Sequence, residues 1–223
     1  MVWFSRAAVK PYRLSPVGPK IRAMEPNTAL PETERGNEHR RRLLQAMASV
    51  AALKGIAAVT IADVVREAGV SKRTFYEHFD SKDACFLALY RAVGAGALRT
   101  LRDAVSEDRP WQQQLEQALR AYLSHMAASP ELLRTLFIEI HHLGVQGEQA
   151  RREIMDAMVD FMVRTLEREP GTRSVDEGLA LAAVGGINEL ILRAIERGQV
   201  AELPSMTATA SEVVRRLARP VAP

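Results

Sequence analysis

The residues whose types suggest a specific chemistry lie close together in the first half of the chain. Lys72 and Arg73 are followed by Thr74 and Tyr76. Lysine and arginine donate hydrogen bonds to guanine O6 and N7, threonine contacts bases or the thymine methyl group, and tyrosine reaches phosphate oxygens. In this combination the residue types favour contact with double-stranded DNA.

These side chains need two short helices to position them, and residues 60–79 predict such a pair. Thr60 is suited to cap the first helix, and Gly69 ends it in the left-handed conformation that glycine adopts readily. In the second helix Phe75 and Phe79 are four residues apart, so both face a core and leave the basic side chains outward. Two helices too short to be stable alone, joined by a three-residue turn, form a helix-turn-helix.

An ordinary amphipathic surface helix with a solvated charged face is the alternative interpretation of this segment. It would leave unexplained the capped helix that precedes it, the turn from Gly69 to Ser71, and the Ser81-Lys82 start of the next helix. The combination of these features therefore favours a DNA-binding motif.

The segment VTIADVVREAGVSKRTFYEHFDSKDACFLALY resembles the DNA-binding domain of the tetracycline-repressor (TetR) family. The similarity covers roughly residues 38–93 and is weak beyond them. The residues that carry it are Thr60, the run Ala68-Gly69-Val70-Ser71, Thr74, Tyr76, Phe79, Ser81 and Lys82.

The resemblance implies roles for the polar residues of the motif. Lys72, Arg73 and Thr74 would contact base edges. The sequence departs from the family pattern at Arg73, where a small residue is common, so the operator sequence of relatives cannot be transferred. The other candidate DNA-binding residues, expected at phosphates or at the groove edge, are Thr60, Tyr76, His78 and Lys82, together with Ser71 in the turn.

The chain divides into three regions, and no stretch alternates with the period of a strand, so we expect an all-α fold. Residues 1–36 are basic and proline-rich, and they form either an arm that contacts phosphates or a disordered extension before a true start at Met24. Residues 37–93 form the three-helix bundle with the helix-turn-helix, and residues 94–219 form a larger helical domain.

Composition and motifs limit the function classes. The 223 residues are 47% hydrophobic with a formal charge of +3, which permits a core and a nucleic-acid partner. The single cysteine, Cys85, fits a reducing cytoplasm, and no apolar run approaches the roughly 20 residues of a membrane span. No nucleophile motif, metal spacing or glycine-rich phosphate loop occurs, so we expect no enzyme activity, no cofactor and no metal. His141 and His142 are adjacent on a helix and point about 100° apart, which rarely suits one ion.

For residues 94–219 the resemblance implies a ligand pocket and a dimer interface. Residues 148–168 and 175–197 carry apolar side chains at the spacing of a helix seam, and two such helices from each chain would form a four-helix interface. A palindromic operator also needs two copies of the recognition helix. The alternative is that both helices serve only the chain's own core. The predicted interface residues are Ile154, Phe161, Ala183, Ile187 and Leu190.

Methionine and aromatic residues could line the pocket, since methionine adapts to varied apolar ligands, although such residues are also common in an ordinary core. The sequence thus predicts a homodimeric repressor that a small apolar ligand releases from its operator. The alternatives are control by a protein partner without a small ligand, and a helical enzyme with an incidental helix-turn-helix. The candidate pocket residues are Trp111, Tyr122, His125, Met126, Phe137, Met155, Met158 and Met162.

Overall fold

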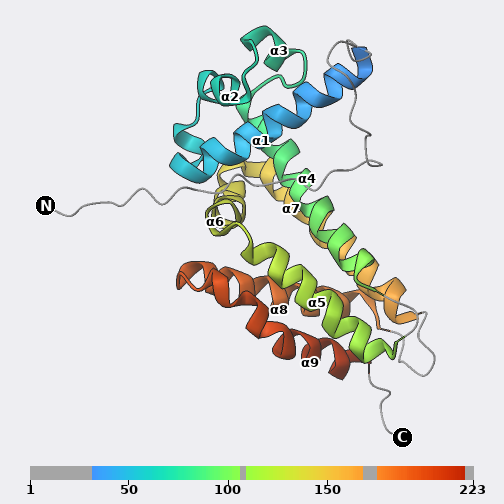
Figure 1. The fold of residues 1–223 in the computed structure, drawn as a ribbon. Helices are drawn as coiled ribbons and strands as arrows, with labels where there is room; N and C mark the ends of the chain where they lie inside the picture. The colour runs from blue at the N-terminus through green and yellow to red at the C-terminus, as the bar shows by residue number, and fades with distance from the viewer. Residues whose placement is uncertain (1–31, 106–108, 168–174, 219–223) are drawn as a thin grey trace, which may run out of the picture.

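The computed structural model describes residues 32–105, 109–167 and 175–218, and within these ranges it contains helices and no strand (Figure 1). The predicted all-α fold is confirmed. The greater part of the proposed tail lies outside the described residues. The helices are α1 (Glu32–Ala58), α2 (Ile61–Ala68), α3 (Lys72–Tyr76), α4 (Lys82–Asp103), α5 (Trp111–Ala127), α6 (Pro130–Glu139), α7 (Gly144–Glu167), α8 (Glu177–Glu196) and α9 (Thr207–Ala218), with 3₁₀ segments η1 (Ile140–Leu143) and η2 (Val200–Met206).

The first helix begins earlier than the sequence predicted. The tail was expected to reach residue 36, whereas α1 begins at Glu32. Gly36 costs a helix only about 1 kcal/mol relative to alanine, so it does not prevent helix formation. The acidic residue Glu34 also stabilises the first turn through the helix dipole. At the other end, Gly55 has a φ of 73° and interrupts the regular helix.

The helix-turn-helix forms through local capping. Thr60 caps α2 as predicted, in a capping box with Asp63, and Gly69, with a φ of 62°, ends that helix. The recognition helix is shorter than predicted, because α3 ends at Tyr76 and the chain reaches Phe79 through a turn. Phe75 and Phe79 nevertheless pack together, with ring centroids 5.8 Å apart.

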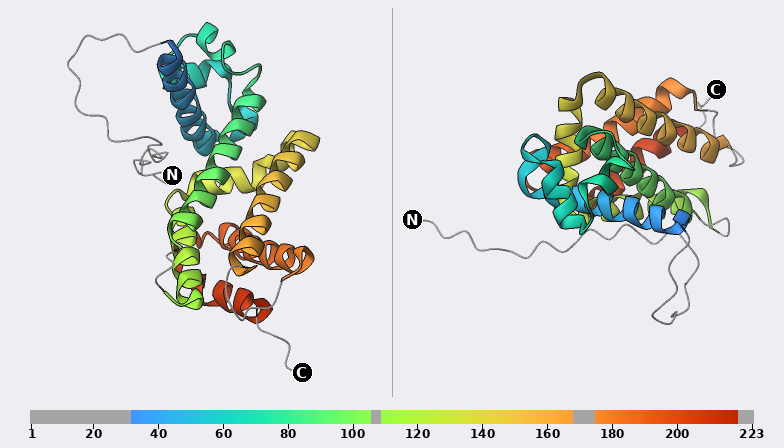
Figure 2. Two further views of the ribbon diagram at one scale, coloured as in Figure 1. Left: turned by 90° about the vertical axis from the view of Figure 1, so that its right-hand side faces the viewer. Right: turned by 90° about the horizontal axis from the view of Figure 1, so that it is seen from above.

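Helix α4 runs through both hydrophobic cores. Its residues up to Val93 belong to the core of the N-terminal bundle, and those from Ala97 onward belong to the core of the C-terminal domain. Leu136 of α6 and Ile140 also belong to the N-terminal core, so the two domains share packed side chains. Figure 2 shows α4 as the continuous connection between the two helical groups.

Two helices, α4 and α8, are long and apolar enough to cross a membrane by length and composition alone. This differs from the expectation that no apolar run has that length. Charged residues interrupt the apolar runs of both helices in the sequence. The mean hydropathy over 18 residues of each helix is nevertheless high, because few of those residues are charged. In α4 the apolar side chains are accounted for by burial in the two cores.

Candidate nucleic-acid interface and apolar cavities

The recognition helix α3 is held at its start by Ser71. The Ser71 Oγ accepts a hydrogen bond from the Thr74 backbone N–H at 3.0 Å, and it lies 2.9 Å from the Thr74 hydroxyl. Phe75 is fully buried and fixes the inner face of the helix against the bundle. The remaining side chains of α3 are therefore directed away from the core.

Three of the predicted DNA-contacting side chains, Lys72, Arg73 and Tyr76, are exposed on this helix, and we call them the α3 face. The Arg73 side chain is 90% exposed, and its Nε donates to Glu77 Oε1 at 3.2 Å. An exposed ion pair of this kind contributes little free energy. The guanidinium group can therefore leave Glu77 for a base edge at small cost.

Thr60, predicted at a phosphate, is engaged within the protein. Its hydroxyl donates to Asp63 Oδ2 at 2.6 Å and accepts the Asp63 backbone N–H at 3.2 Å. Hydrogen bonds from the Lys54 ammonium group and from Thr60 hold the pKa of the Asp63 carboxyl well below its usual range. Thr60 thus stabilises the first turn of α2, and so positions the motif.

His78 is half-buried at the edge of the bundle, beside His39 and Phe79. Burial lowers the pKa of His78, and the neighbouring His39 lowers it further. The imidazole is therefore neutral at physiological pH. It can donate a hydrogen bond to a phosphate, but it adds no positive charge there.

Lys82 has a structural role that the sequence did not predict. Its ammonium group donates to the backbone carbonyl oxygens of Ile56, Ala57 and Val59, at 2.9, 3.2 and 3.1 Å. These three bonds use all the donors of the ammonium group. A phosphate contact from Lys82, as the resemblance implied, would require at least one of these bonds to be exchanged.

Sequence reasoning also missed Arg42, which holds the turn of the motif. Its Nη2 donates to the carbonyl oxygens of Ala68 and Gly69, at the end of α2. A Cβ atom on Gly69 would lie 2.7 Å from this nitrogen. Glycine is favoured at position 69 by its positive φ, and a side chain there would also displace the end of the Arg42 side chain.

Glu139 links the C-terminal domain to the end of α1. Its carboxylate accepts a hydrogen bond from the Ile56 backbone N–H. The carboxylate packs so closely over Gly55 that a Cβ atom there would lie 2.6 Å from Oε1. Because Glu139 is the last residue of α6, this contact joins the two domains directly.

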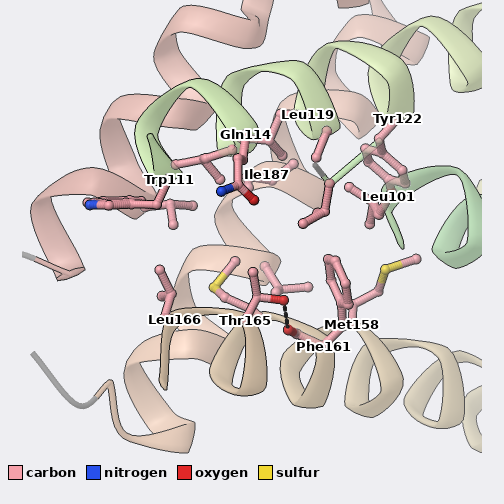
Figure 3. A pocket seen from close by; sticks show the side chains of 16 residues that line it. Leu101, Trp111, Gln114, Leu119, Tyr122, Met158, Phe161, Thr165, Leu166 and Ile187 are labelled. Carbon is pink, nitrogen blue, oxygen red and sulfur yellow. Dashed lines mark hydrogen bonds between the residues drawn. The ribbon is translucent and has the colours of Figure 1, made fainter. Parts of the chain in front are cut away.

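An apolar cavity lies between α5, α7 and α8, and holds about 780 Å³ of space not filled by atoms, part of it open to solvent. In Figure 3 the side chains of α5 face those of α7 across it. Two polar side chains in its wall are engaged: Gln114 Nε2 donates to the Arg109 carbonyl at 2.6 Å, and the Thr165 hydroxyl donates to the Phe161 carbonyl at 2.7 Å. The predicted pocket residues that line this first cavity are Trp111, Tyr122, Met158 and Met162.

A second cavity, of about 850 Å³ including its mouth, adjoins the first. Tyr122, Met158 and Val184 line both cavities. Burial raises the pKa of Tyr122 to about 12, so its hydroxyl stays protonated. The predicted residues Met126, Phe137 and Met155 line the second cavity.

His125, another predicted pocket residue, is in the wall of neither cavity. Burial lowers the pKa of its imidazole, so the ring is neutral at physiological pH. His141, for which a metal-binding role was considered, instead hydrogen-bonds through Nδ1 to Glu148 Oε1 at 2.7 Å. Among the described residues no group of three or more potential metal ligands occurs.

The predicted dimer residues mostly face the chain's own interior. Ala183 and Ile187 are 2% and 7% exposed, and so cannot form the surface of an interface. Ile154 packs directly against Gly94, and Phe161 lines the first cavity, while Leu190 is half-buried. The prediction was wrong for Ala183 and Ile187 because helical periodicity identifies an apolar stripe without identifying the surface that it packs against.

The N-terminal bundle is similar to a known family of proteins. Residues 43–89 match the family model described as "Bacterial regulatory proteins, tetR family". Over 171 residues the chain is 27% identical to the nucleoid occlusion factor SlmA of Aliivibrio fischeri strain MJ11, which covers 75% of this chain and 83% of that protein. The uncharacterized HTH-type transcriptional regulator YerO of Bacillus subtilis is 42% identical over 52 residues, which are 23% of this chain and 18% of YerO.

The fold is also similar to solved structures. The transcriptional regulator FadR from Bacillus subtilis, in complex with stearoyl-CoA, matches with a TM-score of 0.66 at 17% identity. The match covers 78% of this chain and 96% of that one. At this level of identity the likeness establishes the shared fold.

Proposed function

Because the N-terminal domain of this chain belongs to the tetR family of bacterial regulatory proteins, we propose that the chain is a cytoplasmic transcriptional repressor, and that a small apolar ligand releases it from its operator. The observation that carries the ligand part of this proposal is the pair of adjoining apolar cavities in the C-terminal domain. An apolar pocket with a few polar groups is typical of a small-molecule site. The proposal assigns the chain no catalytic activity.

On the DNA side, the α3 face would enter the major groove. Arg73 and Lys72 offer the donors that guanine accepts, and the exposed Tyr76 would contact the phosphate backbone. Thr74, His78, Thr60, Ser71 and Lys82 support this surface by positioning its helices or by contacting the groove edge.

A palindromic operator requires a homodimer, and the outward face of α8 is suited to form one. Leu181 is 48% exposed, Ala182 is exposed, and a Cβ atom on Gly185 or Gly186 would meet no atom within 4 Å. Small residues let two helices approach closely. We call Leu181, Ala182, Gly185 and Gly186 the outer α8 face, and we propose that it packs against its copy in a second chain.

The structural relative FadR was solved in complex with stearoyl-CoA, whose stearoyl group is a long apolar chain, and this supports a ligand with such a chain for a fold of this kind. In this chain the methionine and aromatic lining of the two cavities would accommodate such a ligand. Filling the cavities would favour a conformation with lower affinity for DNA. By linkage, DNA would lower the affinity for the ligand by the same factor.

The test begins with selection of bound DNA from random sequence, followed by titration of lipophilic compounds against the protein–DNA complex. The matched variant is Ala118→Phe, because Ala118 lines the first cavity and is 4% exposed. The variant should bind operator like the wild type and should lose its response to the compound, with an unfolding measurement to confirm that it is folded. A ligand response unchanged by the filled cavity would contradict the proposal.

The second candidate function is that of a DNA-binding factor controlled by a protein partner. The similarity to a nucleoid occlusion factor, over a long stretch of the chain, favours it. If no compound alters operator affinity and Ala118→Phe behaves like the wild type, this alternative replaces the ligand-responsive repressor.

A further inference from the structure

The second cavity differs from the first in having a charged arginine side chain and several polar side chains in its largely apolar lining. Tyr90 of α4, His141 of η1, Arg151 of α7 and Asn188 of α8 all lie in its lining. The first cavity has no charged side chain in its lining. The two adjoining cavities thus offer a cationic end and an apolar end to one ligand.

Arg151 has hydrogen-bond donors that are available to a ligand. Its Nε donates to Glu148 Oε2 at 3.3 Å, but its two terminal nitrogens have no hydrogen-bond partner in the described part of the chain. Glu148 is also bonded to His141 and does not line the cavity. A guanidinium group presents parallel N–H donors that match the two oxygens of a carboxylate.

The position of Arg151 suits a headgroup at the mouth of the cavity. Its side chain is 36% exposed and that of His141 is 52% exposed, so this end of the cavity reaches solvent. Tyr90 also lines this cavity and is half-buried. Burial raises the pKa of Tyr90, while the nearby charge of Arg151 opposes the shift, so a protonated hydroxyl is available as a donor close to the guanidinium.

Three lining residues of the second cavity also line the first. Tyr122, Met158 and Val184 line both cavities, so these side chains stand where the two cavities adjoin. An apolar chain that passes from the second cavity into the first would do so beside them. The charge of a carboxylate would remain near solvent, where its desolvation cost is small, while the tail is buried.

The geometry points to an amphipathic carboxylate, with an unbranched aliphatic tail, as the ligand of these two cavities. The carboxylate binds the terminal nitrogens of Arg151 with support from Tyr90 and Asn188, and the tail passes Tyr122 towards the first cavity. This inference rests on the proposed function and names the ligand class of the same site.

The test compares dodecanoate with dodecanol, which has the same chain length and no charge, by calorimetric binding to the full-length protein. The wild type should bind dodecanoate at least about tenfold more tightly, since a hydrogen bond to a charged group supports a difference of this size. Arg151→Met should remove that difference and leave dodecanol binding unchanged. The unfolding midpoint of the variant confirms that it is folded.

The matched control is Arg152→Met. Arg152 is the adjacent arginine on α7, it is exposed, and it does not line the cavity. This variant makes the same change in net charge, so it should preserve the preference for dodecanoate. Val184→Phe, at the junction of the cavities, should weaken dodecanoate binding while sparing hexanoate, whose tail is too short to pass the junction.

Equal binding of dodecanoate and dodecanol, or equal effects of Arg151→Met and Arg152→Met, would overturn the carboxylate assignment. If dodecanol then still releases the protein from DNA, the proposed function remains supported although the carboxylate assignment fails. If neither compound binds, the inference fails, and the proposed function is then decided by the titration of other lipophilic compounds.

Discussion

At the scale of single residues, two long cationic side chains hold the ends of helices in the DNA-binding domain. Lys82 reaches the carbonyl groups at the end of α1, and Arg42 reaches those at the end of α2. The Ile56 carbonyl also accepts the Val59 backbone N–H, at 3.2 Å. Carbonyl groups at the end of a helix generally lack partners within it, and a cation there also meets the negative end of the helix dipole. The positions of α2 and α3 on the bundle therefore depend on both cations.

Replacement of Lys82 by methionine should destabilise the protein by about 2 kcal/mol, since the hydrogen bonds of a charged donor are lost and carbonyl groups are left unsatisfied. Urea unfolding measures the change. Lys72→Met is the control, because Lys72 is exposed on α3, and its replacement should alter the free energy of unfolding by less than about 0.5 kcal/mol. Equal stability of the two variants would show that the contacts of Lys82 are unimportant.

A second prediction at this scale concerns base recognition by Arg73. Arg73→Ala should cost about 1–3 kcal/mol per lost base contact and relax the preference at one position in each half-site. Tyr76→Phe removes a hydroxyl suited to a phosphate contact. It should lower the binding affinity for all DNA sequences by the same factor. Operator affinities against point-mutated sites distinguish the two effects. If Arg73→Ala lowers every affinity equally, Arg73 contacts phosphate and not a base.

The sequence predicted residue roles that depend on local spacing and missed those that depend on distant contacts. The capping box of Thr60 follows from a residue three positions away. By contrast, Arg42 contacts residues 26 and 27 positions away, and Glu139 contacts a backbone group 83 positions away. Nothing in the local pattern identifies such partners, because they come together only when the helices pack.

At the scale of elements, α8 shows the same limit. Its predicted range, residues 175–197, is close to the observed Glu177–Glu196, because the 3.6-residue period is a local property. The helix is apolar on more than one side, however. One side, including Ala183 and Ile187, packs in the chain's own core, and the outer α8 face is uncovered. Only the packing of the helices shows which side of α8 is buried and which is exposed.

This separation predicts different outcomes for two neighbouring arginine substitutions. Gly186→Arg places a charge on the outer α8 face, where there is open space, and arginine favours a helix more than glycine does. It should give a folded monomer. Ile187→Arg would place an unpaired charge in the core and should cost several kcal/mol of folding free energy.

Sedimentation together with circular dichroism measures both assembly and folding of these variants. A wild type that sediments as a monomer at micromolar concentration would refute the proposed dimer. A dimeric Gly186→Arg protein would refute the assignment of the interface to the outer α8 face, and would leave the dimer itself intact.

At the scale of the whole molecule, a short series of contacts connects the second cavity to the DNA-binding domain. Phe137 and Ile140 line this cavity, and Glu139 lies between them on the chain. Glu139 accepts the backbone N–H of Ile56, whose carbonyl group is in turn bound by Lys82 at the start of α4. A ligand that displaces the end of α6 would therefore shift the end of α1, and with it the base of the helix-turn-helix.

The last prediction is that Glu139 carries much of the coupling between ligand and DNA. Glu139→Ala should leave ligand binding nearly unchanged, because Glu139 does not line the second cavity. It should reduce the factor by which a releasing compound lowers operator affinity, since the contact between α6 and the end of α1 is lost. Linkage requires that the effect of DNA on ligand affinity fall by the same factor, so both titrations must agree.

Glu131→Ala is the matched control, because Glu131 is an exposed acid on the same helix with no contact to α1 described. It should retain the coupling of the wild type. Unfolding measurements on both variants separate a loss of coupling from a loss of stability. Equal coupling in the two variants would show that the signal passes between the domains by another route, such as the shared core around Leu136 and α4.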